Sequence, residues 1–193
     1  MRVISGTARS VPLQSRDGLD TRPTADRVKE AMFNIIQFEV EGRRVLDLFG
    51  GSGQLAIEAL SRGAAEAVIV DQSKDSVSVI RQNLEKTRLA DRAELICADY
   101  MEYLNRARGK FDLVFLDPPY RETFLENALK RISEIDILKS GAIIICERSA
   151  DKQLPDSYAG FSRTREYRYG KTGITVYRQQ PCLKTETGGN NHE

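Results

Sequence analysis

Residues 115–122, FLDPPYRE, bring together groups that could hold a flat amine. The exocyclic amine of a nucleobase is planar and a poor nucleophile until its lone pair localises on the nitrogen. Two acceptors that each take a hydrogen bond from one of its N–H groups favour this localised lone pair. The carboxylate of Asp117 and the backbone carbonyl of Pro118 are such acceptors. Because Pro118 and Pro119 lack an N–H group and have a fixed φ angle, this carbonyl is held in place beforehand. Tyr120 can stack on the base, which is worth roughly 1–3 kcal/mol.

A glycine-rich turn lies upstream, in VLDLFGGSGQLAIEAL. Gly50, Gly51 and Gly53 allow a tight bend and a close approach of the backbone to a ligand. A helix that follows such a turn presents free N–H groups at its start. The spacing matches neither the G-x-G-x-x-G of dinucleotide-binding proteins nor a phosphate-binding P-loop. Asp47, just before the turn, would repel a pyrophosphate and suits a cationic or amine-bearing ligand.

Two further carboxylates end the next two predicted strands. Asp71 comes about 20 residues after the turn, where an acidic side chain can accept the hydroxyls of a ribose, and Asp99 could receive an adenine amino group. Either aspartate could instead only cap the next helix. Together the carboxylates predict a nucleoside with a charged, non-phosphate substituent, which fits S-adenosylmethionine better than a nicotinamide cofactor. The predicted cofactor-binding residues are Asp47, Phe49, Gly50, Gly51, Gly53, Asp71, Gln72, Asp99 and Tyr100.

The composition excludes several other kinds of chemistry. The single histidine, His192, lies in a polar, glycine-rich tail, so histidine-based hydrolysis and His-bearing zinc sites are excluded and no metal is expected. Three cysteines without a C-x-x-C pair indicate a reduced compartment. No apolar run approaches the roughly 18 residues of a membrane span, and the N-terminus lacks the apolar segment of a secretory signal. We therefore expect a cytoplasmic protein with no membrane partner.

The elements that must position these residues alternate from Arg43 onward. Five apolar runs have the character of strands, and segments of helical periodicity separate them. This pattern predicts an α/β fold with a doubly wound, mostly parallel sheet covered on both faces. A hairpin around a Gly-Lys-Thr-Gly turn should close the edge and bring the sheet to seven strands. The parallel strands are expected at 44–49, 66–71, 93–98, 111–117 and 142–147, and the antiparallel hairpin within 161–179.

An arm and an amphipathic helix precede the sheet. Apolar residues recur with helical spacing from Val28 to Ile36, and two short β-like pieces before them predict a hairpin arm. The last residues are polar and glycine-rich, which is typical of a disordered tail. We expect one domain over 1–180, with the arm and helix in 1–40 and the catalytic sheet in 41–180, and a disordered tail over 181–193.

Basic residues gather near both ends of the chain. Residues 1–29 carry six basic side chains against three acidic ones, and residues 162–178 carry five against one, with tyrosines interleaved. This distribution predicts a phosphate-binding face, although an ordinary solvated surface gives the same pattern. The candidate phosphate contacts are Arg22, Arg27, Arg165 and Arg168.

The sequence resembles the RsmD-type family, guanine-N2 methyltransferases of small-subunit (16S) ribosomal RNA, over about residues 1–180. The likeness includes RPTADRVKEAMFN, LDLFGGSGQLAIEALSRGA, VIVDQS and FLDPPY. The last of these looks like the D/N-P-P-Y/F signature of enzymes that methylate exocyclic amino groups of bases. The resemblance implies the class I S-adenosylmethionine-dependent methyltransferase fold. It also implies methyl transfer to the 2-amino group of a guanine, with S-adenosylhomocysteine as product.

The same resemblance implies a partner and roles for the site residues. The partner would be small-subunit ribosomal RNA or an assembling small ribosomal subunit. The catalytic residues would be Asp117, Pro118, Pro119 and Tyr120, and the RNA-binding residues Arg22, Arg27, Arg165 and Arg168.

Three alternatives stay open. An adenine-N6 methyltransferase acting on DNA carries the same tetrapeptide, but 193 residues leave little room for a target-recognition domain. A non-catalytic RNA-binding module with a vestigial cofactor pocket is disfavoured by the intact tetrapeptide and glycine turn. A nicotinamide-dependent dehydrogenase is disfavoured by the glycine spacing.

Overall fold

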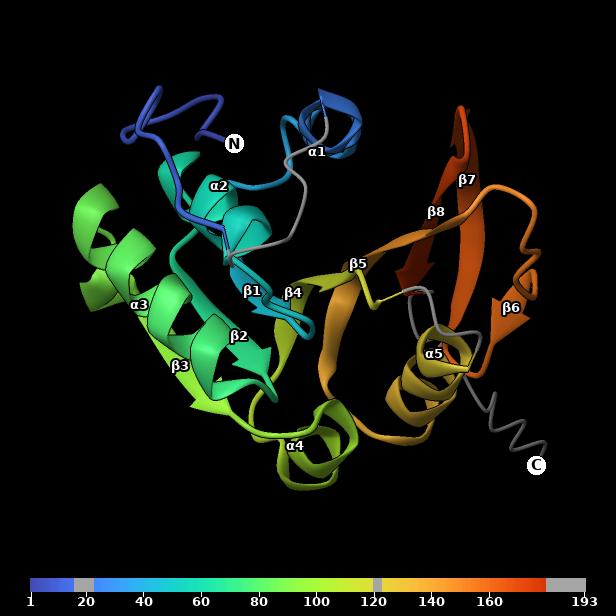
Figure 1. Cartoon of the computed structure of the whole chain (residues 1–193). Helices are drawn as coiled ribbons and strands as arrows, with labels where there is room; N and C mark the ends of the chain where they lie inside the picture. Colours follow the sequence, from blue (N-terminus) through green and yellow to red (C-terminus); the bar gives the residue numbers. More distant parts are fainter. Residues whose placement is uncertain (16–22, 120–122, 180–193) are drawn as a thin grey trace, which may run out of the picture.

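The structure is a computed structural model that describes residues 1–15, 23–119 and 123–179, with only the backbone of residues 23–25 (Figure 1). Its described residues form one eight-stranded sheet in the order β3-β2-β1-β4-β5-β8-β7-β6. Five strands are parallel: β1 (Arg44–Asp47), β2 (Glu66–Asp71), β3 (Ala93–Cys97), β4 (Phe111–Leu116) and β5 (Leu138–Ser149). Three are antiparallel: β6 (Ser157–Tyr158), β7 (Phe161–Tyr169) and β8 (Thr172–Gln179).

The predicted doubly wound fold with a C-terminal antiparallel hairpin is confirmed, with two differences in the sheet. The short strand β6 pairs with the start of β7 and makes the sheet eight-stranded rather than seven-stranded. Strand β5 is also longer than the predicted 142–147. It extends beyond 147 because Arg148 and Ser149 pair with β8, and it begins before 142 with Leu138, which pairs with Phe111 of β4.

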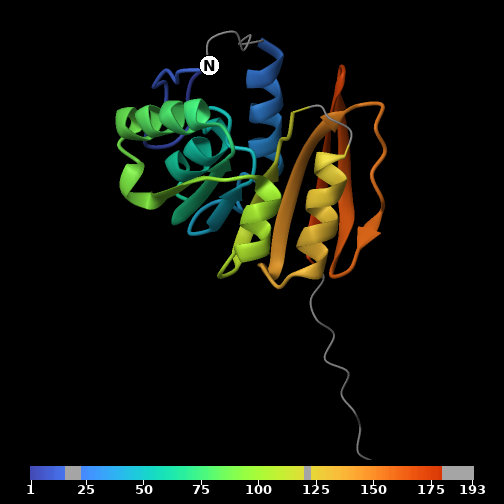
Figure 2. The same cartoon turned by 60° about the horizontal axis from the view of Figure 1, so that its bottom comes forward.

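Helices cover the two faces of the sheet, as the alternation of strand side chains requires. Leu113 and Phe115 of β4 face one apolar core, and Val114 and Leu116 face the other. The first core is covered by α1 (Pro23–Ile35), α2 (Gln54–Ser61) and α3 (Lys74–Thr87). The second is covered by α4 (Tyr100–Arg106) and α5 (Phe124–Glu134), which lie beside each other in Figure 2. A 3-10 turn (Ala90–Arg92) leads from α3 into β3.

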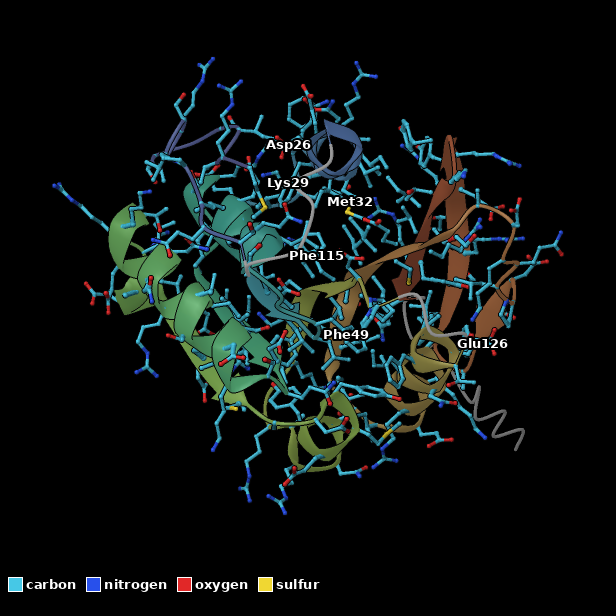
Figure 3. All side chains as sticks on the ribbon, viewed as in Figure 1. Asp26, Lys29, Met32, Phe49, Phe115 and Glu126 are labelled. Carbon is cyan, nitrogen blue, oxygen red and sulfur yellow. The ribbon has the colours of Figure 1, made fainter. Side chains whose placement is uncertain are left out.

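The first helix and the N-terminal arm pack as one unit on the first face. Lys29 and Met32 of α1 are buried (Figure 3). Phe33 of the same helix contacts Phe115 of β4, with ring centroids 5.5 Å apart. The Lys29 ammonium donates to the carbonyl of Arg2 (2.7 Å) and lies 3.8 Å from a carboxylate oxygen of Glu58.

The arm folds back on itself and also attaches to α2. The carboxylate of Glu58 accepts hydrogen bonds from the backbone N–H groups of Ile4 (2.8 Å) and Ser5 (3.0 Å). The two predicted β-like pieces pair through one isolated antiparallel bridge, Arg2 with Pro12, and through backbone hydrogen bonds that Val3 donates to Val11 (3.0 Å) and Leu13 to Met1 (3.1 Å). The buried Lys29–Glu58 pair therefore ties the arm, α1 and α2 together.

Candidate active site

Three carboxylates meet at the carboxyl ends of β1, β4 and β5, and we call Asp47, Asp117 and Glu147 the carboxylate corner. Strand alternation puts all three on the α1 side, because each follows core residues of that face by two positions: Val45, Phe115 and Ile145. Parallel pairing of Leu116 with Cys146 brings Asp117 next to Glu147. Ligands of open α/β sheets bind at this edge.

Asp47 is the most enclosed member of the corner, at 1% exposure. One carboxylate oxygen accepts a hydrogen bond from the N–H of Ala56 (3.3 Å), and the other oxygen is buried without a hydrogen-bond partner among the described residues. Burial raises the pKa of Asp47 to about 7, against the lowering effect of backbone N–H groups, and the charge of Asp71 adds to the rise. A buried acceptor that lacks a donor is costly. It therefore suits a ligand that brings a cationic donor.

The glycine turn before α2 shows which glycine a ligand can approach. A Cβ at Gly50 would lie 2.7 Å from a methyl of Ile69, and one at Gly53 would lie 3.0 Å from a methyl of Ile80. A side chain at either position would collide with one of these isoleucines, so packing of the protein itself, and not the approach of a ligand, requires the two glycines. Gly51 has φ +57°, and the nearest atom to a Cβ there is 4.0 Å away, so this residue faces open space.

Asp71 and Asp99 both bond to the backbone. The Asp71 carboxylate accepts from the N–H of Gly51 (2.8 Å) and from that of Ser73 (2.8 Å). Asp99 is the N-cap of α4 and accepts from the N–H groups of Met101 and Glu102 through one oxygen. Asp71 thus fixes the glycine turn, and Asp99 has the capping role that the sequence left open. Asp71 is half-buried and Asp99 exposed, as is Gln72 next to Asp71.

An aromatic cluster lies beside this edge of the sheet, towards α4 and α5. The rings of Phe49, Tyr100 and Phe124 have centroids 5.1–6.4 Å apart, within the range of stacked and tilted aromatic pairs. Each ring is only half-buried. The cluster therefore presents partly exposed aromatic surface next to the glycine turn, which suits a planar ring such as a nucleobase.

Asp117 is half-buried, Pro118 buried and Pro119 exposed at the end of β4. Burial raises the pKa of Asp117 well above its ordinary value, and the neighbouring charges of Glu147 and then Asp47 raise it further. A carboxyl group in this environment binds a proton readily. Tyr120, the last residue of the predicted catalytic tetrapeptide, lies outside the described residues.

The candidate phosphate contacts are not gathered on one surface. Arg27 is exposed on α1, and Arg22 lies outside the described residues. Arg165 and Arg168 are both exposed, but they are three positions apart on β7 and so face opposite sides of the sheet. Arg165 pairs in register with Val176, which packs in the core under α1, so it shares the face of α1. Arg168 lies on the other side, 3.5 Å from a carboxylate oxygen of Asp151.

Among the described residues, no three His, Cys, Asp or Glu side chains are grouped so that they could hold a metal ion. No helix among the described residues combines the length and apolar character needed to cross a bilayer.

A family model described as Conserved hypothetical protein 95 matches residues 1–178. The chain belongs to this family. Among its curated relatives is Ribosomal RNA small subunit methyltransferase D of Haemophilus influenzae, 34% identical with 92% of each chain covered. YlbH of Bacillus subtilis, named as a candidate rRNA methyltransferase, is 38% identical over 93% of this chain and 100% of its own. The predicted RsmD-type resemblance is therefore confirmed.

A solved structure supports the same assignment. The structure of yhhF from Escherichia coli, named as a candidate methyltransferase, superposes with a TM-score of 0.83 at 30% identity and covers 94% of this chain and 98% of its own. The predicted enzyme class, a methyltransferase, is thus confirmed by relatives and neighbours alike.

The structure adds three residues that the sequence analysis missed. Glu147 joins the corner because β5 lies beside β4, and the sequence alone gave no strand order. Phe124 joins the aromatic cluster from the start of α5. Gln54, the first residue of α2, has a buried side-chain oxygen without a partner among the described residues, as Asp47 does. Gln54 could have been found from its position directly after the glycine turn.

Proposed function

We propose that the chain transfers a methyl group from S-adenosylmethionine to the 2-amino group of a guanine in small-subunit ribosomal RNA. One observation carries this proposal: Asp117, Pro118 and Pro119 end β4 directly beside β1, whose own end holds Asp47 and leads into the glycine turn. Acceptor groups for an amine therefore lie next to the buried carboxylate and the glycine turn that suit a cationic nucleoside, on the same edge of the sheet.

The donor side fits the groups that S-adenosylmethionine presents. The partnerless oxygens of Asp47 and Gln54 suit its ammonium group, and Gly51 leaves room for its methionine part. Asp71 and Gln72 would meet the ribose. Phe49, Tyr100, Phe124 and Asp99 would hold the adenine. The bound donor supplies a methyl group already activated by the positive sulfur, so the protein has mainly to position the two reactants.

The acceptor side would orient the guanine amine. Asp117 and the Pro118 carbonyl accept its two N–H bonds, and Tyr120 stacks on the base. The nitrogen forms its bond to the methyl carbon as the carbon–sulfur bond breaks, and the product amine must then lose one proton. Asp117 is suited to take that proton, because its raised pKa makes its carboxylate a stronger base than an ordinary aspartate.

Ribosomal RNA is the proposed acceptor because curated relatives are named for it. Arg27 and Arg165 lie on the same face of the molecule as the carboxylate corner and would contact phosphates, with salt-dependent affinity. These relatives are bacterial, and bacterial small subunits are assembled in the cytoplasm, so we place the protein there.

The test is incubation with a labelled methyl donor and three acceptors: isolated small ribosomal subunits, naked small-subunit rRNA and duplex DNA. Mass spectrometry of the digested nucleic acid then identifies the methylated nucleoside. We expect N2-methylguanosine in one or both ribosomal acceptors and none in DNA. Label confined to DNA adenine would establish the adenine-N6 alternative, and calorimetry showing that NAD binds and S-adenosylmethionine does not would remove the proposed donor.

A further inference from the structure

Glu147 lies where a second side chain would reach the acceptor base. Leu116 of β4 pairs with Cys146 of β5, so the next residues, Asp117 and Glu147, are neighbours on adjacent parallel strands, which are about 4.8 Å apart. Both follow residues of the α1-side core, Phe115 and Ile145, and therefore share a face. On its other side Glu147 pairs with Ile174 of β8, which pairs in turn with Tyr167 of β7.

The juxtaposition of Asp117 and Glu147 is electrostatically unfavourable. Burial raises the pKa of Asp117 most, and the charge of Glu147 raises it next, ahead of that of Asp47. Both carboxyl groups are half-buried, so the charge of one opposes ionisation of the other. Groups held in such an arrangement at a ligand-binding edge are candidates for function.

The chemistry of guanine supplies a reason for a second acidic side chain. The edge of guanine that carries the 2-amino group presents three hydrogens, two on N2 and one on N1. Asp117 and the Pro118 carbonyl account for the two on N2. The third needs its own acceptor, because a buried donor without a partner costs binding free energy. Adenine differs at this point, since its N1 is an acceptor and would face a carboxylate with no hydrogen between them.

We propose that Glu147 accepts the N1–H of the target guanine and thereby makes the enzyme specific for guanine over adenine. This inference rests on the proposed function and assigns its base specificity to one residue. Asp117 holds the reacting amine, and Glu147 reads the neighbouring ring position. Recognition by a hydrogen bond of this kind can discriminate strongly, because the wrong base leaves a charged group unpaired.

The experiment uses an rRNA substrate that carries the guanine identified by mass spectrometry, and the same RNA with 2-aminopurine at that position. The analogue keeps the 2-amino group but has an acceptor at N1. For the wild-type enzyme we expect kcat/KM to fall roughly 100-fold or more on the analogue. The amide of Glu147→Gln can accept from the N1–H of guanine and can donate to the N1 of the analogue. For this variant we expect the ratio of kcat/KM on guanine to kcat/KM on the analogue to shrink to about tenfold or less.

Controls separate this inference from the proposed function. Glu126→Gln alters a half-exposed carboxylate of α5 that pairs with Lys152, and should leave the ratio at the wild-type value. Donor affinity measured by calorimetry should be unchanged in Glu147→Gln. Wild-type enzyme that methylates both bases equally well would overturn the inference without any variant. An unchanged ratio in Glu147→Gln would overturn it too. No methylation of guanine by the wild type would instead refute the proposed function.

Discussion

The two halves of the sheet edge use their carboxylates differently. On the β2 and β3 side, Asp71 and Asp99 each accept two backbone N–H groups, which hold the glycine turn and begin α4. On the β4 and β5 side, Asp117 and Glu147 lie together, and their mutual charge opposes ionisation of Asp117. The first pair stabilises the fold while it shapes the proposed donor site, whereas the second pair combines burial with like charge at the edge where ligands of such sheets bind.

Asp47 stands between the halves and has properties of both. It accepts a backbone N–H bond near the start of α2, as the β2 and β3 aspartates accept theirs, but its other oxygen has no partner among the described residues. Its charge raises the pKa of Asp117, and the charge of Asp71 raises its own. A cationic ligand at Asp47 would therefore relieve repulsion on both sides at once. Binding of the donor and preparation of the acceptor side are thus expected to be weakly coupled, with little effect on donor affinity itself.

The largest effect is expected from Asp117→Ala. Transfer should fall by roughly 10³-fold, because one of the two acceptors of the amine is lost, while donor affinity stays nearly unchanged. Single-turnover kinetics and calorimetry measure the two quantities. Asp112→Asn is the matched control: it removes a carboxylate charge near the opposite end of the same strand, where Asp112 accepts from Lys139 (2.7 Å). It should cost stability but not transfer rate. Equal loss of rate and donor affinity in Asp117→Ala would contradict the division into halves.

A smaller effect is expected from Asp47→Asn. Replacing the charge opposite the donor ammonium should raise the donor dissociation constant roughly 10–100-fold, the range of a hydrogen bond to a charged group. Denaturant unfolding at pH 8 should show no loss of stability, because the buried charge has been removed. A variant that loses stability while keeping donor affinity would show that Asp47 has only a structural role.

Asp71→Asn and Asp99→Asn should differ in how much they lower stability, although both residues follow strands and accept hydrogen bonds from the backbone. Asp71→Asn replaces a charged acceptor of two N–H bonds by an amide with one acceptor oxygen, and should lower stability by about 1–3 kcal/mol. Asn is as good an N-cap as Asp, so Asp99→Asn should change stability by only a few tenths of a kcal/mol. Chemical denaturation of both variants checks this. Equal losses would mean that the two aspartates have equivalent roles.

The sequence predicted most of the fold because its signals are local. Apolar runs such as 66–71 become strands with the predicted bounds, and the tight turn at Gly50–Gly53 follows from glycine chemistry. The predicted hairpin within 161–179 is present as β7 and β8. Strand β6 was missed because two residues carry no periodic signal, and its pairing depends on the tertiary approach to β7.

The site was predicted less completely, because tertiary neighbours decide it. Asp47, Asp71, Asp99 and Asp117 could be found as strand-end carboxylates, but Glu147 required the knowledge that β5 lies beside β4. Charge counting grouped Arg165 with Arg168, while the alternation of β7 separates them. Assigning the residues of the predicted strand alternately to its two faces would have shown that Arg165 and Arg168 point to opposite sides. Composition thus indicated the kind of surface but not its geometry.

The smallest effect, and the most direct probe of the link between the halves, is a proton released when the donor binds. Because burial raises the pKa of Asp47 to about 7, the free protein carries this carboxyl mostly protonated at pH 6. Protonation of Asp47 also stabilises the folded state. This contribution to the free energy of unfolding is fully present below the pKa of the aspartate in the unfolded chain, near 4, and is lost as the pH rises through about 7. A bound ammonium group favours the ionised carboxylate, so binding should release most of a proton at pH 6 and less as the pH rises through about 7.

Calorimetric titration of the donor in buffers of different ionisation enthalpy measures this release. The difference between the wild type and Asp47→Asn isolates the contribution of Asp47 from that of the donor's own amino group. If the ion pair also relieves the repulsion on Asp117, the release in the wild type at pH 6 should exceed that in Asp117→Asn, which keeps Asp47 and Glu147 but lacks the carboxyl of Asp117. Identical release in these two proteins would mean that the donor and acceptor halves titrate independently, and the coupling through Asp47 would then have to be abandoned.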